Sequence, residues 1–197
     1  METDAQLLER IRRDDPGAFE AFVDRYGDRV YRFGLRVCGH REDAKDVLQE
    51  TLIQSYKALR NLEHPEALRS WLYRVASNAC LMMRRKGKHE PERELSLAEL
   101  APGADDGPVA EIPDPGELPD AQLERARWQA LVQEAVGDLP AHYRIVLVMR
   151  DMEQLSTQEV ADALGLDISA VKMRLHRARL KVRQRLEQTL RGRGARP

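Results

Sequence analysis

The chain has 197 residues, enough for one large or two small domains, and a formal net charge of -1. Aromatic residues make up only 5% and charged residues 33%, so we expect an aliphatic, helical core. No apolar run approaches the roughly 18 residues of a membrane span, and the polar N-terminus is not a signal peptide. Cys38 and Cys80 have no metal-binding spacing, which favours buried thiols in a cytoplasmic protein without metal or cofactor.

The first third of the chain predicts three amphipathic helices. Residues 3–13 have the apolar spacing of a short helix. Asp15 and Pro16 predict the capped start of a second helix, which Gly39 ends. A third helix is predicted over about 41–59. Its outer face carries acids and an amide: Asp43, Asp46, Gln49 and Glu50.

A basic helix follows a loop at 61–65 and runs over about 66–85. Six bases and no acid lie between Arg69 and Lys88, with Trp71 and Tyr73 among them. Composition then changes abruptly, because residues 90–124 carry eleven acids, one base and six of the ten prolines. This stretch predicts a flexible acidic linker, and the residues alone favour a passive tether.

Helical periodicity resumes near residue 121 and leads to a helix-turn-helix over 155–186. Ser156 and Glu159 have the spacing of a capping box, Gly165 can end the first helix, and Asp167 can cap the second. The second helix has one apolar stripe, basic residues on its other faces and no acid between Asp167 and Glu187. A helix of this kind can enter the major groove of DNA. The alternative is a solvated basic helix at the end of a bundle. It is disfavoured because the two N-caps, the glycine stop and the one-sided basic charge occur together.

The sequence therefore predicts an all-α chain of two small helical domains joined by a flexible acidic Pro-rich linker. The first domain covers 1–88, the linker 89–121 and the helix-turn-helix domain 122–190, and a short basic tail covers 191–197.

Several motifs then resemble the extracytoplasmic-function group of bacterial RNA polymerase sigma factors. They are Phe19-x-x-Phe22-Val23-x-x-Tyr26, the run Asp43 to Thr51, the run Trp71 to Asn78, Asp138-Leu139-Pro140 with Tyr143-Arg144-x-Val146-Leu147, Glu159-Val160-Ala161, and the run Val171 to Arg179. Each motif is weak alone, but their order and spacing match both domains of the family.

The resemblance implies a surface that binds core RNA polymerase. It assigns this role to Asp43, Asp46, Leu48, Gln49 and Glu50. Without the resemblance, an ordinary solvated helix face is the simpler interpretation.

The resemblance also implies that the basic helix recognises and opens the minus-ten promoter element. The candidates for this role are Asn61, His64, Trp71, Arg74, Asn78, Arg84 and Arg85. Bases that leave the stack need a basic groove with aromatic or amide groups. Trp71 could equally be a core anchor, and His64 beside Pro65 fits an ordinary loop residue.

In the second domain the resemblance implies binding to the minus-thirty-five duplex. The candidates are Ser156, Thr157, Lys172, Met173, Arg174, His176, Arg177 and Arg179. Lys172, Met173, His176 and Arg177 are expected near base edges, whereas Arg174, Arg179 and Arg183 are expected at phosphates. Ser169-Ala170 replaces the small pair that often precedes the Val-Lys of the family, which leaves the first contacts of this helix open.

The family further implies core RNA polymerase, promoter DNA and an anti-sigma factor as partners, a linker that threads toward the polymerase active-site channel, and no membrane insertion. The alternative function is a self-sufficient helix-turn-helix regulator with an N-terminal ligand or dimerisation domain. An enzyme is not expected, because the sequence has no Gly-rich phosphate loop and no clustered Ser/His/Asp set.

Overall fold

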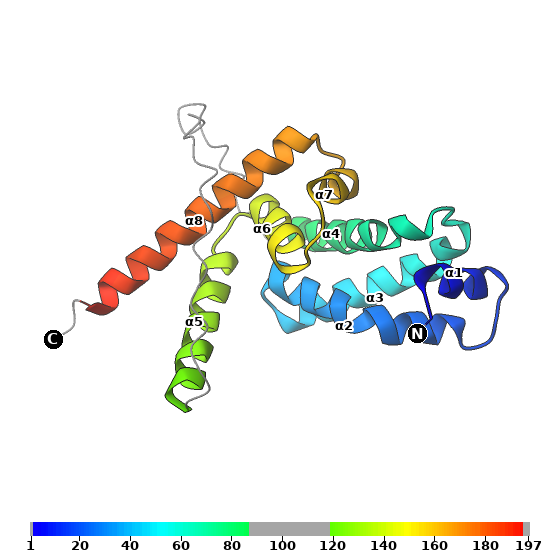
Figure 1. Ribbon diagram of the computed structural model, residues 1–197, viewed down its shortest axis with the longest axis horizontal. Helices are drawn as coiled ribbons and strands as arrows, with labels where there is room; N and C mark the ends of the chain where they lie inside the picture. Colours follow the sequence, from blue (N-terminus) through cyan, green and yellow to red (C-terminus); the bar gives the residue numbers. More distant parts are fainter. Residues whose placement is uncertain (1, 87–118, 195–197) are drawn as a thin grey trace.

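The computed structural model describes residues 2–86 and 119–194, with side chains for 2–83 and 124–191. Within these ranges all regular secondary structure is helical, which confirms the predicted all-α class. Four helices with two short 3-10 turns form the first half of the chain, and four further helices form the second half (Figure 1). Most of the predicted linker over 89–121 lies outside the described residues, as do residues 195–197.

The first half is a bundle of α1 (Asp4–Arg12), α2 (Ala18–Cys38), α3 (Arg41–Ala58) and α4 (Leu68–Lys86). The 3-10 turns Leu59–Asn61 and Pro65–Ala67 connect α3 to α4. A capping box begins α1, since Thr3 Oγ1 accepts from the Gln6 amide at 3.3 Å and the Gln6 side chain accepts from the Thr3 amide at 2.9 Å.

The predicted start of α2 at Asp15 and Pro16 is wrong. The helix begins at Ala18, after Gly17 with φ of 79°, and no side chain caps it. Asp14 also has a positive φ of 54°, so residues 14–17 form a tight reversal rather than a first helical turn. Pro16 therefore lies inside a turn, where its fixed φ is equally acceptable.

Gly34 determines how closely α2 and α3 pack. A Cβ at this position would lie 3.3 Å from the Ala44 Cα and from Val47 side-chain atoms. The centre of the bundle is filled by fully buried Phe22 and Phe33 and by Leu72 of α4. The aliphatic stripes seen in the sequence are thus the core of this domain.

The second half contains α5 (Pro119–Gly137), α6 (Ala141–Leu147), α7 (Thr157–Leu164) and α8 (Ile168–Gly194). A π-helical turn, Val148–Met152, continues α6 and leads to the loop before α7. Helix α8 extends four residues into the stretch expected as a basic tail and passes through Gly192 to end at Gly194. Helices α5 and α8 project away from the first bundle (Figure 1).

The two halves of the chain share one hydrophobic core. Buried Val37 and Cys38 at the end of α2 belong to the same cluster as Tyr143 and Val146 of α6. Arg144, only 4% exposed, crosses this boundary and donates to the Val37 carbonyl at 2.6 Å. It also donates to the Leu139 carbonyl at 2.8 Å, so one guanidinium satisfies backbone groups from both halves.

Candidate nucleic-acid and polymerase interfaces

The helix-turn-helix predicted over 155–186 is present as α7 and α8. Ser156 Oγ accepts from the Glu159 amide at 3.1 Å, and the Glu159 carboxylate accepts from the Ser156 amide at 2.7 Å. The Ser156 backbone N–H is the main reason why the pKa of Glu159 is lowered from its ordinary value. Gly165 ends α7 in the left-handed region, with φ of 63°, as expected from the sequence.

One stripe of α8 is buried against the rest of this domain, namely Val171, Leu175 and Ala178. The opposite side of the helix is open to solvent over its first three turns. The exposed residues there are Ser169, Lys172, Met173, His176 and Arg179. The first helix of the motif contributes exposed Ser156 and half-buried Thr157.

Arginines expected at phosphates are partly engaged within the protein. Arg179 forms a bidentate ion pair with Asp151, at 3.0 and 2.8 Å, and this hydrogen bonding raises the Arg179 pKa. Arg183 pairs with Glu187 at 2.9 Å on its own helix. Arg174 and Arg177 are half-buried, and Arg177 approaches the Tyr143 hydroxyl at 3.5 Å. Lys172 and His176, in contrast, are exposed and have no ion pair among the described residues.

Helix α4 carries a second stripe of candidate side chains. Trp71, Arg74 and Asn78 follow each other at three- and four-residue steps, which places them on one face. Arg74 and Asn78 are exposed, and Trp71 is half-buried against the core cluster, so it has both a packed and an open side. Met82, 58% exposed, continues this face. Sequence reasoning missed it, although its i+4 position after Asn78 could have identified it.

Two further minus-ten candidates, Asn61 and His64, lie before α4 and do not join this face. Asn61 and His64 are exposed in the connection before α4, and His64 pairs locally with Glu66 at 3.1 Å. The backbone of Arg84 and Arg85 belongs to the last turn of α4, but their side chains lie outside the described residues.

The polymerase-binding candidates occupy the solvent side of α3. Asp46 and Gln49 are exposed, and Asp43 and Glu50 are half-exposed on the same side. Leu48 is half-buried and packs against the core cluster instead. Two exposed apolar residues on α3, Ile53 at 41% and Tyr56 at 57%, lie outside the predicted set.

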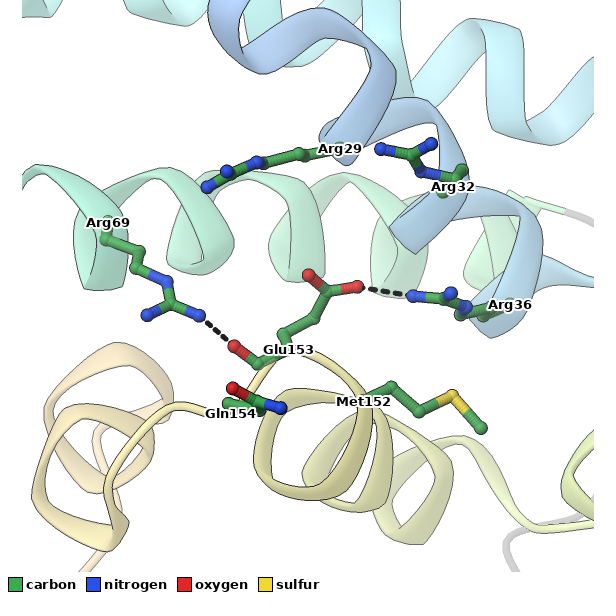
Figure 2. A pocket seen from close by; sticks show the side chains of 7 residues that line it. All are labelled: Arg29, Arg32, Arg36, Arg69, Met152, Glu153 and Gln154. Carbon is green, nitrogen blue, oxygen red and sulfur yellow. Dashed lines mark hydrogen bonds and ion pairs between the residues drawn. The ribbon is translucent and has the colours of Figure 1, made fainter. Parts of the chain in front are cut away.

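A polar seam joins the two halves beside α4 (Figure 2). Glu153, in the loop after the π-helical turn, inserts its carboxylate toward α2 and α4, and Arg36 pairs with it at 2.6 Å. The Tyr73 hydroxyl donates to the other carboxylate oxygen, and Arg69 donates to the Glu153 backbone carbonyl. Burial, followed by this hydrogen bond to Glu153, raises the pKa of the Tyr73 phenol.

The seam continues between α4 and α7, where Arg74 donates to the Asp162 carbonyl. One of the predicted minus-ten side chains is thus engaged by the first helix of the helix-turn-helix. The described residues contain no group of three or more His, Cys, Asp or Glu side chains that could hold a metal ion. No helix in the described part of the chain combines the length and apolarity that a bilayer crossing needs.

Comparison with known proteins accounts for both halves of the chain. Residues 22–90 match the Sigma-70 region 2 family and residues 129–182 match the Sigma-70 region 4 family. The chain is 30% identical over 179 residues to the ECF RNA polymerase sigma factor SigW of Bacillus subtilis, covering 91% of this chain and 94% of that protein. It is 29% identical over 191 residues to the RNA polymerase sigma-H factor of Pseudomonas aeruginosa, covering 96% and 97%.

Solved structures share the fold. The sigma factor RpoE of Bartonella quintana, determined with the anti-sigma factor NepR, has a TM-score of 0.60 and 20% identity, covering 87% of this chain and 98% of that one. CnrH, determined with the cytosolic domain of CnrY, has a TM-score of 0.64 and 24% identity, covering 95% and 99%. The alternative of a self-sufficient regulator is not favoured by these matches. With both regions in order and relatives matched over nearly their whole length, the chain belongs to the ECF RNA polymerase sigma factors.

Proposed function

We propose that this protein is a dissociable subunit of a bacterial RNA polymerase, acting in the cytoplasm without catalytic chemistry of its own. It would bring core polymerase to promoters through α8 and help to open the minus-ten element through α4. The observation that carries this proposal is the presence of both sigma regions, in order, on one chain that has solvent-facing candidate side chains on two separate helices, α8 and α4. A simple repressor does not need the second of these helices.

The exposed residues support this division of labour. Lys172, Met173 and His176 of α8 are open to a major groove, where lysine and histidine donors can reach base edges. Trp71, Asn78 and Met82 offer stacking and amide groups to unstacked bases. The acidic face of α3, joined by Ile53 and Tyr56, would bind the core enzyme.

The two halves must separate for this function. Helices α4 and α7 are in contact here. The minus-ten and minus-thirty-five promoter elements, by contrast, lie about 25 base pairs apart, which is roughly 85 Å of B-DNA at about 3.4 Å per base pair. The chain between Lys86 and Pro119 can bridge about 110 Å at most when extended, so the covalent connection permits this separation.

We further propose control by an anti-sigma partner. The sigma factor RpoE of Bartonella quintana, which has the same fold, was solved with an anti-sigma factor, and this supports a similar mode of control here. Co-purification from native cells would identify the partner, and a free, fully active protein in those cells would contradict this part of the proposal.

Transcription in vitro with purified core polymerase tests the main proposal. We expect initiation from a subset of templates in a promoter library, and only when this protein is present. Failure to initiate on every template, together with tight binding of a palindromic duplex by the protein alone, would overturn it.

A further inference from the structure

We propose that Arg29, Arg32, Arg36 and Arg69, here called the arginine surface, bind backbone phosphates of promoter DNA, and that Glu153, through its contacts with Arg36 and Arg69, covers one end of this surface until the two halves separate. The inference rests on the proposed function, because it requires the protein to meet DNA with its halves apart. It concerns mainly α2, a helix on which no predicted DNA-binding residue lies.

The arginine surface is assembled by two helices. Arg29, Arg32 and Arg36 follow each other along α2 at three- and four-residue steps, so they share one face that is about 10 Å long. Arg69 comes from the first turn of α4, across the same cavity (Figure 2). The cavity has a volume of about 470 Å³, and Met152, Glu153 and Gln154 line its other side.

The charges around this cavity do not balance. Four guanidinium groups line it, and the only carboxylate among the lining residues is that of Glu153. Arg36 pairs with this carboxylate at 2.6 Å, and Arg69 donates to the Glu153 backbone carbonyl. Among the described residues, Arg29 and Arg32 have no hydrogen bond or ion pair, and both side chains are exposed.

The single acid comes from the other half of the chain. When Glu153 leaves with α7, the four arginines of the first half lose their only counter-charge in the cavity. Arginine forks match the oxygens of a phosphate, and exposed like charges at this density favour an anionic partner. Glu153 therefore occupies, with a carboxylate, a position that a phosphate can take after separation.

Two features favour a nucleic-acid backbone over a small free anion. The row on α2 extends over about 10 Å, which suits successive phosphates of one strand better than a single compact group. The surface also flanks α4, the helix proposed to meet the minus-ten element, and Arg74 of that helix is engaged across the same seam. Separation of the two halves would free the arginine surface and Arg74 at the same time.

The first test measures how promoter binding by the holoenzyme depends on salt. In Arg29→Gln/Arg32→Gln the side-chain stems remain while two charges are lost. We expect the slope of log K against log salt to fall in magnitude by about 1–2, since each phosphate contact contributes about 0.7–0.9. Arg13→Gln/Arg191→Gln removes two exposed charges outside the cavity and should leave the slope unchanged. An unchanged slope in the first variant, or an equal fall in both, would overturn the inference.

The second test uses the free protein and a non-specific duplex. Glu153→Gln removes the covering charge, and we expect the affinity for DNA to rise about threefold to tenfold. In the Arg29→Gln/Arg32→Gln background this gain should disappear. An equal gain in both backgrounds would show that Glu153 does not cover the arginine surface.

Inorganic triphosphate serves as the small-anion probe for the free protein. Arg29→Gln/Arg32→Gln could abolish triphosphate binding and yet leave the salt dependence of promoter binding unchanged. That result would assign the surface to a small anion and overturn the DNA assignment. Non-specific DNA binding by the free protein is independent of transcription, so these results remain distinct from a failure of the proposed function.

Discussion

The Glu153 carboxylate lies 2.6 Å from the Arg36 guanidinium, although 117 residues separate the two along the chain. The Glu153 side chain is 11% exposed and that of Arg36 is 38% exposed, so the pair is only partly screened by water. The carboxylate also accepts from the Tyr73 hydroxyl. One side chain of the second half thus holds two residues of the first.

Replacement of this side chain should loosen the seam between the halves. We expect Glu153→Ala to lower the free energy of opening, measured by amide hydrogen exchange in α7, by about 1 kcal/mol after allowance for screening. Glu187→Ala removes an acid that pairs with Arg183 at the far end of α8, and exchange in α7 should be unaffected. If the amide groups of α7 exchange at the same rate in the wild type and in Glu153→Ala, the role given to the Glu153–Arg36 pair is contradicted.

Arg144 should matter more for stability than any surface arginine. Arg144→Met keeps an unbranched apolar stem but leaves the buried Val37 and Leu139 carbonyls without this donor, at about 1–3 kcal/mol for each buried group. Urea denaturation should therefore show a loss of several kcal/mol. The matched Arg183→Met, at a side chain that is 77% exposed, should change stability by less than about 0.5 kcal/mol.

The capping box of α7 should make stability depend on pH. The Glu159 pKa is lowered in the folded protein, so its stabilising contribution is present above the ordinary carboxyl range and disappears as the pH falls through the lowered value. Thermal unfolding from neutral pH to about pH 3 should show this loss, and Glu159→Gln should reduce it. Ser156→Ala should cost about 1 kcal/mol at neutral pH. An unaltered pH profile in Glu159→Gln would show that the box does not contribute.

The exposed face of α8 should specify the promoter without contributing to polymerase binding. Lys172→Ala/His176→Ala removes two groups that are free of ion pairs in the described structure, and we expect at least a tenfold loss of transcription from a cognate promoter. Competition for core polymerase should be unchanged. A loss of core binding in this variant would contradict the division of labour.

The outer face of α3 should show the reverse behaviour. Asp46→Arg/Gln49→Ala reverses one exposed charge and truncates its neighbour, so binding to core polymerase should weaken at least tenfold. Glu124→Arg, at an exposed acid on α5, is the matched charge reversal. If Asp46→Arg/Gln49→Ala competes normally for core enzyme, the polymerase-binding assignment fails.

Local sequence determined most of the helices and several of their ends. The Ser156–Glu159 box, the Gly165 stop and the apolar stripe of α8 depend on residues within one or two turns, and all three are present as predicted. The start of α2 was predicted wrongly, because the positive φ values of Asp14 and Gly17 outweigh the preference of Asp and Pro for a helix start. The sequence also underestimates the length of α8, since the helix continues through Gly192 to Gly194 although glycine lowers helix propensity.

Only the tertiary structure decided which distant charges meet. The sequence identified a basic face on α4 and an acidic linker, but it gave no sign that Glu153 would lie among Arg36, Arg69 and Tyr73. Helical periodicity reports which face of a helix is apolar, whereas the partner of each polar residue depends on how whole domains pack. Contacts between residues more than 80 positions apart follow from that packing, and so do the buried position of Arg144 and the covering of the arginine surface.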